Sequence, residues 1–174
     1  EGLNFVKKLF QIDGVTIIGG MSLTTAFLGF IYSISYTTAA VTLFMLALMP
    51  FLASLIAFIF LKEKISKQNF VSMVIAFIGT LVMIYASAFS GSFFGLIMGF
   101  ISSLGFAAFS VALRSKSDIK KFYILIYGGL FCALFSSLLM IINNQDFYIP
   151  IKNVYLSMTH GTLVASGLIL FSIG

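Results

Sequence analysis

Two long uncharged segments, separated by one short basic turn, constrain the fold of this chain more than any other feature. Residues 38–61 run for 24 positions and residues 70–89 run for 20 positions without a charged side chain. An α-helix rises about 1.5 Å per residue, so about 20 apolar residues cross a hydrocarbon core of roughly 30 Å. The turn from Lys62 to Lys67 carries three lysines and one glutamate and must lie in water. The pattern therefore predicts two antiparallel membrane-spanning helices.

The composition of the chain extends this prediction to its full length. Hydrophobic residues make up 60% of the sequence and charged residues 9%, whereas soluble domains average about 45–50% and about 25%. Four further apolar segments are expected as helices, at 15–36, 93–113, 122–142 and from about 155 to the end. We therefore predict an all-α fold, a polytopic membrane helix bundle with six transmembrane helices. Residues 1–14 are expected to form a connecting loop, with an interfacial amphipathic helix as the alternative.

The positions of the basic residues predict the orientation of the bundle. Nine of the ten Lys and Arg residues fall in segments 1–14, 62–69 and 114–121, and the alternate segments hold only Lys152. By the positive-inside rule the first group of segments is cytoplasmic. Six spans that alternate across the membrane reproduce this assignment without exception. We therefore expect a protein integral to the cytoplasmic (inner) membrane, with its N-terminal segment on the cytoplasmic side.

Small and hydroxyl-bearing residues form one stripe on the first helix, at offsets that follow the 3.6-residue period of an α-helix. Such a stripe faces protein or water rather than lipid, so it either packs against other helices or lines a substrate path. Packing is favoured for Ser22, Thr25 and Gly29. For Tyr32 and Tyr36 the two interpretations are evenly balanced, because a buried tyrosine hydroxyl needs a partner. The stripe consists of Ser22, Thr25, Gly29, Tyr32, Ser33 and Tyr36.

Pro50 predicts a kink in the second helix, because proline donates no backbone hydrogen bond and frees the carbonyl of Leu46. The kink is either passive or a flex point beside a central cavity, and Met49 gives it a soft, adaptable surface. The only histidine, His160, is either an interfacial residue or a polar contact at the entrance to the cavity. The residues that we predict to bind substrate are Tyr32, Tyr36, Met49, Pro50 and His160.

A run of small residues at every fourth position predicts where the fourth helix packs. Gly91, Gly95, Gly99, Ser103 and Ala107 would form a seam along one face, which lets two helices approach closely. The third helix is almost purely apolar, so we expect it to be peripheral and to face lipid.

The second and third helices also carry an ordered set of residues: small residues, a mid-helix proline, Leu and Glu at the helix end, and a spaced glycine. These residues are Ala39, Ala40, Pro50, Leu61, Glu63 and Gly79. The pattern resembles the EamA-type module of the drug/metabolite transporter (DMT) superfamily, strongly over residues 14–87 and more weakly over 88–174. Two positions depart from it, since Lys62 stands where the family usually has Gly and Ser72 stands at the first glycine position.

The resemblance implies a ten-helix transporter built from two five-helix repeats in inverted orientation. This chain would hold helices three to eight, with residues 1–87 as the C-terminal part of the first EamA-type repeat. Residues 88–174 would be the N-terminal part of the second repeat. Tyr32-Ser33-Ile34 is similar to Phe171-Ser172-Ile173 on a helix expected to run the opposite way, as in an inverted repeat.

The sequence lacks the motifs of several kinds of chemistry. It shows no cluster of His, Cys, Asp or Glu with metal-ligand spacing, no Gly-rich phosphate loop, and no charged residue within the predicted spans. We therefore expect no cofactor, no metal and no catalytic residue, and we do not expect an enzyme. The basic residues sit in short membrane-anchoring clusters, so no nucleic-acid partner is expected.

The interpretation that best fits these features is a secondary transporter (permease) for a small metabolite or drug-like solute. Its expected partners are that small-molecule substrate and the lipid bilayer, and a homodimer is left open. One alternative is a non-transporting membrane scaffold or assembly subunit. A less favoured alternative is an integral membrane enzyme acting on lipid, which should show a carboxylate cluster that these spans lack.

Overall fold

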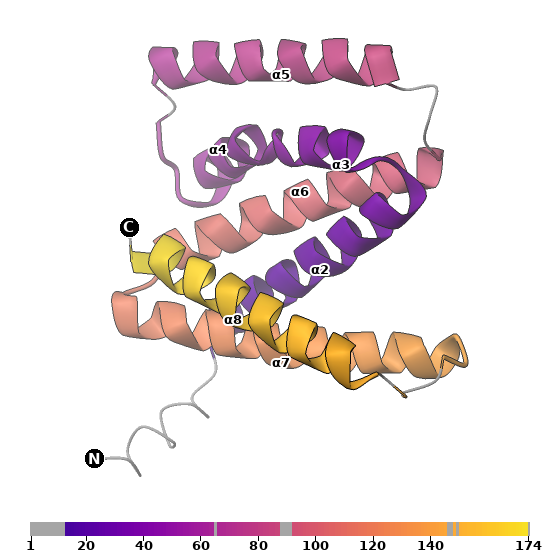
Figure 1. Ribbon diagram of the computed structural model, residues 1–174. Coiled ribbons are helices and arrows are strands. Elements are labelled where there is room, and N and C mark those ends of the chain that lie inside the picture. The colour runs from indigo at the N-terminus through magenta and orange to yellow at the C-terminus, as the bar shows by residue number, and fades with distance from the viewer. Residues whose placement is uncertain (1–12, 65, 88–91, 146–147, 149, 174) are drawn as a thin grey trace.

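The computed structural model describes residues 13–64, 66–87, 92–145, 148 and 150–173. These residues form α-helices joined by short turns and include no β-strand. The loop predicted for residues 1–14 falls, except for its last two residues, outside this described part of the chain. The helices are α2 (Gly14–Tyr36), α3 (Ala39–Leu46), α4 (Met49–Phe60), α5 (Lys67–Ser87), α6 (Phe93–Arg114), α7 (Asp118–Ile142) and α8 (Ile151–Ile173) (Figure 1).

Five helical stretches among the described residues are long and apolar enough to cross a membrane. Helices α3 and α4 together form one of these stretches, Ala39–Phe60. In α5 the apolar stretch is shorter, Phe70–Gly79. The prediction of an all-α, polytopic membrane bundle is therefore confirmed, with five spans by this measure and α5 as a sixth, shorter apolar helix.

Two helices begin earlier than the hydropathy pattern predicts. Helix α7 begins at Asp118 rather than Phe122, and α8 begins at Ile151 rather than Tyr155. The first turn of α8 is polar but helical, because the amides of Asn153 and Val154 donate to the carbonyl of Pro150 at 2.8 and 3.2 Å. His160, which was expected in the first turns of its helix, is therefore the tenth residue of α8.

The kink predicted from Pro50 is present as an interruption between α3 and α4. The amide of Ala47 donates to both Leu43 and Phe44, and the amide of Leu48 donates to the carbonyl of Met45 at 3.1 Å. This tighter i to i−3 pattern ends α3 at Leu46, four residues before the proline. Pro50 then occupies the first turn of α4, where its missing N–H group costs nothing.

The small-residue seam of α6 is confirmed as a packing face. A Cβ atom added at Gly95 would lie 2.4 Å from Thr37 Cγ2, and one added at Gly99 would lie 2.8 Å from Ser33 Oγ. Both distances are too short for a real side chain, so only glycine allows this approach of α6 to α2. Gly91, the first residue of the predicted seam, lies outside the described residues.

The core is built around α6, which packs against α2 on one side and against α3 and α4 on another (Figure 1). One apolar cluster joins α3, α4 and α6 through residues such as Leu48, Leu52 and Ala107. A second cluster joins α2, α6 and α7 and consists of Leu23, Phe109, Ala112, Leu113 and Ile124, all at most 7% exposed.

Helices α5 and α8 lie at the edges of the bundle. Helix α5 lies beyond α3 and α4 in Figure 1, and its described side chains are mostly exposed, with Met73 as the buried exception. The expectation that this helix is peripheral is thus confirmed. Helix α8 lies over α7, and its first thirteen residues are exposed.

Candidate functional site

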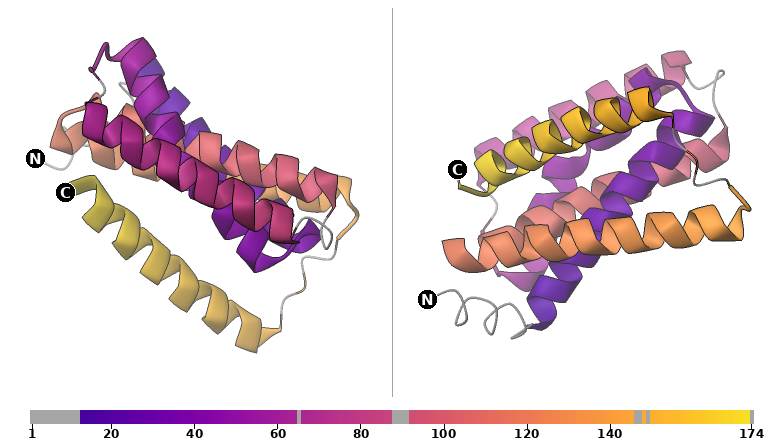
Figure 2. Two further views of the ribbon diagram at one scale, coloured as in Figure 1. Left: turned by 90° about the horizontal axis from the view of Figure 1, so that it is seen from above. Right: turned by 60° about the horizontal axis from the view of Figure 1, so that its bottom comes forward.

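Helix α7 touches α2 and α8 near one end of the bundle and separates from both toward the other. The basic end is defined here as the end where α2 begins and α4, α6 and α8 finish; the open end is opposite. Near the middle of both helices, Thr24 Oγ1 of α2 donates to the carbonyl of Gly128 of α7 at 3.2 Å. At the basic end, Lys121 Nζ donates to the carbonyl of Ser172 at 2.9 Å. Figure 2 (left) shows α8 diverging from the other helices toward its N-terminal end.

Two cavities lie along the middle and last turns of α2. The tyrosine cavity, of about 340 Å³, lies between the last turns of α2 and α7. A second cavity, of about 370 Å³, lies mainly between α2 and α6 and shares Tyr32 with the first. Its other lining residues include Thr24, Thr25, Gly29, Met98, Ile101 and Phe135. The polar residues that line the tyrosine cavity are Tyr32, Ser35, Tyr36, Ser136, Asn143 and Gln145.

The rings of the tyrosine cavity form one aromatic group. Tyr32 and Tyr36 stack with ring centroids 6.5 Å apart, and Phe94 meets Tyr36 edge-on at 5.1 Å. Hydroxyl and amide groups complete the polar lining, and none of the residues that line this cavity is charged. Such a lining suits a neutral or zwitterionic solute, which needs a few hydrogen bonds in an otherwise apolar cleft.

A third cavity, the histidine groove, lies between α7 and α8. It measures about 580 Å³ and is lined mainly by apolar side chains, together with Cys132, Ser136 and His160. Ser136 lines this groove as well as the tyrosine cavity. The two cavities therefore lie on either side of α7, and the Ser136 hydroxyl borders both. His160, predicted at the entrance to a cavity, thus lies in the largest of these spaces.

Met49 and Pro50 lie elsewhere. Met49 packs against the apolar cluster of α3, α4 and α6. Pro50 lines a separate cavity of about 250 Å³ between α4 and α5, together with Ser72 and Phe77. The structure therefore places Tyr32 and Tyr36 together, but Met49 and Pro50, which were predicted to bind the same substrate, lie away from them.

The stripe on α2 divides between two faces, which explains this difference. Ser33 is fully buried and its hydroxyl bonds to that of Thr42 on α3 at 2.9 Å. Neighbouring residues on an α-helix point about 100° apart, so Tyr32 lies on another face, beside α7. The residues of the stripe recur at offsets of 3, 4 and 7, so they spread over a broad face of α2. That face is too wide for one partner helix to cover.

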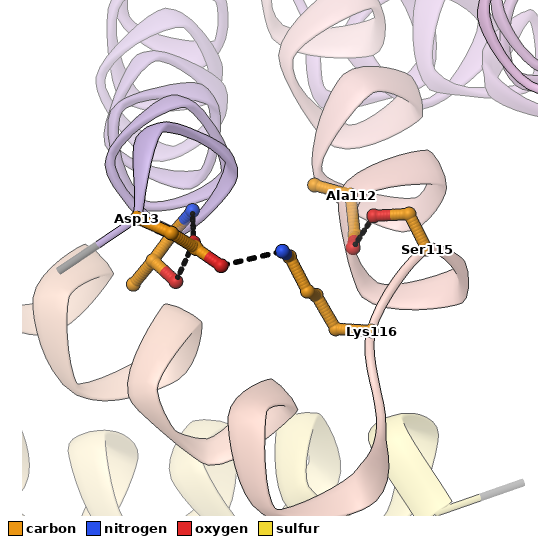
Figure 3. A network of polar contacts seen from close by, with 5 residues as sticks. Asp13, Ala112, Ser115 and Lys116 are labelled. Atoms are coloured by element: carbon orange, nitrogen blue, oxygen red, sulfur yellow. Dashed lines mark hydrogen bonds and ion pairs between the residues drawn. The ribbon is translucent and has the colours of Figure 1, made fainter. Parts of the chain in front are cut away.

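Ion pairs occupy the basic end (Figure 3). Asp13 caps α2 by accepting from Thr16 N at 2.9 Å and Thr16 Oγ1 at 2.7 Å, and its second oxygen accepts from Lys116 Nζ at 2.5 Å. The hydrogen bonds from Lys116 and then from Thr16 hold the pKa of Asp13 well below its usual range. Arg114 and Glu63 form a second pair at 2.8 Å, which is more exposed.

Sequence reasoning missed several residues of these cavities. Cys132, Ser136 and Asn143 follow one another at offsets of 4 and 11 along α7, the same period that revealed the stripe on α2. A periodicity search on this helix would therefore have found them. The Asp13–Lys116 pair joins residues 103 positions apart, and no local pattern reveals it.

These features define a polytopic α-helical membrane protein with cavities between its helices. Residues 7–85 match the model of the EamA-like transporter family, which belongs to the drug/metabolite transporter superfamily. The resemblance seen in the sequence is thereby confirmed. No curated protein and no solved structure compared with the chain matches it.

Proposed function

We propose that this chain is part of a secondary transporter that moves a small metabolite or drug-like solute across the cytoplasmic membrane. The observation that carries this proposal is the uneven spacing around α7. The tyrosine cavity separates it from α2 toward the open end and the histidine groove separates it from α8, while the apolar cluster around Leu23 and Ile124 joins α2, α6 and α7 toward the basic end. Access from one side with closure on the other is what alternating access requires. The match of residues 7–85 to the model of a transporter family supports it.

The charge distribution supports an orientation for this cycle. Basic residues gather at the basic end, which by the positive-inside rule would be cytoplasmic, with the N-terminal segment on that side. The tyrosine cavity, at the open end, would then lie on the outer side. We retain the ten-helix inverted repeat, with its boundary between residues 87 and 88, as part of the proposal, and a homodimer stays a prediction.

The positions of the cavities support different roles for the predicted site residues. Tyr32 and Tyr36 would contact the solute in the tyrosine cavity, and His160 would contact it in the histidine groove. Met49 and Pro50 would act at a distance, by letting α3 and α4 flex about their interruption.

Uptake into proteoliposomes tests the proposal. The full-length protein is reconstituted and screened with labelled neutral and zwitterionic metabolites. For a transported solute, Tyr32→Phe should raise KM several-fold, because it removes one hydrogen bond to the solute. Tyr85→Phe is the matched control, since Tyr85 lies on α5 with 82% of its surface exposed. Pro50→Ala should lower the maximal rate with little effect on KM.

Two outcomes would count against the proposal. Uptake no greater than in protein-free liposomes for every solute would favour the non-transporting scaffold. Equal kinetics for Tyr32→Phe and Tyr85→Phe would place the solute path away from the tyrosine cavity.

A further inference from the structure

The carboxylate of Asp13 connects two distant parts of the fold. One oxygen holds the first turn of α2 through Thr16, and the other accepts from Lys116, in the turn between α6 and α7. The Lys116 side chain is only 16% exposed and that of Asp13 is 37% exposed. A charge-assisted hydrogen bond at this burial is screened far less than one in open solvent.

The end of α6 holds Lys116 in place for this contact. Ser115 ends the helix, its hydroxyl donates to the carbonyl of Ala112 at 2.8 Å, and the Lys116 amide donates to the carbonyl of Leu113 at 3.1 Å. Figure 3 shows Lys116 extending from this turn toward Asp13. Hydrogen bonds to the end of α6 therefore fix the backbone from which the Lys116 side chain extends.

The ion pair lies beside the apolar cluster that fills the basic end. Ala112 and Leu113 belong to that cluster and precede Lys116 by four and three residues. Gly19 of α2 comes so close that an added Cβ atom would lie 2.7 Å from Ile124 Cγ2 and 3.1 Å from Ala112 Cβ. If α2 moved away from α6 and α7 at this end, the ion pair and the cluster would open together.

We propose that Asp13 and Lys116 form a latch that holds the basic end of the bundle closed and opens when the transporter exposes its cavities to that side. This inference rests on the proposed transport function. The Arg114–Glu63 pair at the same end does not serve this role, because its side chains are 52% and 44% exposed. Exposed pairs contribute little to stability.

The sidedness of labelling at Cys132 tests the latch. Cys132 lines the histidine groove and is the only cysteine of this chain. The full-length protein, with Cys132 as its single cysteine, is placed in right-side-out and in inverted membrane vesicles. A membrane-impermeant methanethiosulfonate reagent is added to each. The unmodified protein should react quickly from the open-end side and slowly from the basic side.

Two substitutions remove the ion pair with little other change. Asp13→Asn keeps a side-chain oxygen for the Thr16 amide, because asparagine caps helices as well as aspartate does. Lys116→Met keeps the length of the side chain. Each should raise the labelling rate from the basic side about tenfold, as expected for the loss of one charge-assisted hydrogen bond. Lys116→Arg keeps the charge and should label like the parent protein.

Glu63→Gln is the matched control, because it removes the exposed pair at the same end and should leave the rates unchanged. The latch is overturned if Asp13→Asn and Lys116→Met lower thermal stability without changing the sidedness of labelling. It is also overturned if Glu63→Gln gives the same increase. The labelling needs no solute, so failure of the latch leaves the proposed function standing. If sided labelling is normal but no solute is taken up, the result counts against the proposed function alone.

Discussion

Replacing Gly105 by alanine should force α6 away from α2. A Cβ atom added at Gly105 would lie 2.8 Å from Ala26 N and 2.8 Å from Ser22 O. Both are backbone atoms of α2, so no side-chain rotation can relieve the contact. Carbon contacts are favourable from about 3.5 Å, so the two helices would have to separate by about 0.7 Å at this point.

The expected cost follows from two opposing effects. Inserting a methyl group into a packed interface costs about 1–3 kcal/mol, and a rigid backbone places this site in the upper half of that range. Alanine is a better helix former than glycine by about 1 kcal/mol, which offsets part of the cost. We expect a net loss of about 1–2 kcal/mol, or roughly 5- to 30-fold in the unfolding equilibrium constant.

Unfolding by denaturing detergent, followed by the loss of helical circular dichroism, measures this loss. The control is Gly79→Ala on α5, where an added Cβ atom would have no neighbour within 4 Å. That variant should be as stable as the parent protein, or more stable by up to about 1 kcal/mol. If Gly105→Ala proves no less stable than Gly79→Ala, the close packing of α2 on α6 is refuted.

Three further predictions follow from individual sites. Lys62 has a φ of 54° just after α4, so Lys62→Gly should stabilise the protein by about 1 kcal/mol in the same detergent titration, and no gain would contradict that backbone geometry. Single cysteines in place of Lys120 and Asn144, in a cysteine-free background, should label from opposite sides of the membrane, and labelling from one side would refute the topology. Ser33→Ala should cost about 1 kcal/mol, because it leaves the buried Thr42 hydroxyl with one partner fewer, and an unchanged stability would show that the remaining partners suffice.

The parts of the fold that depend on local sequence could be predicted. The length of the segments without charged residues predicted the helices, and Pro50 predicted the interruption. Both predictions depend on residues close together in the chain. The left-handed backbone at Lys62 is also a local feature of the chain. The EamA pattern usually has glycine there, and the structure shows why glycine would fit this position better.

The faces of the helices were harder to predict. The repeat of Gly95 and Gly99 located a packing seam on α6, but Gly105 contacts α2 just as closely and falls outside that four-residue repeat. A helix buried on several sides uses several overlapping faces, and one period cannot separate them. For the same reason the stripe on α2 did not reveal that Ser33 and Tyr32 face different neighbours.

The cavities could not be predicted from one helix at a time, because they arise where α2 and α7 diverge. Glycines allow the close contact of these two helices. Gly20 and Gly128 meet toward the basic end, where a Cβ atom added at Gly20 would lie 3.1 Å from Gly128 N. Toward the open end, Leu28, Tyr32 and Ser136 line the tyrosine cavity between the same helices.

The α2–α7 pair comes close where Gly20 and Gly128 meet and leaves room for the tyrosine cavity between its last turns. A rigid helix that rocks about such a contact changes the spacing at its far end most and keeps its close contact nearly constant. The hydrogen bond from Thr24 to the Gly128 carbonyl lies beside that contact. It ties α7 to one position along α2, about which α7 would turn. We infer that the glycine contact is the pivot of the proposed transport cycle, with the Asp13–Lys116 latch on one side of it and the tyrosine cavity on the other.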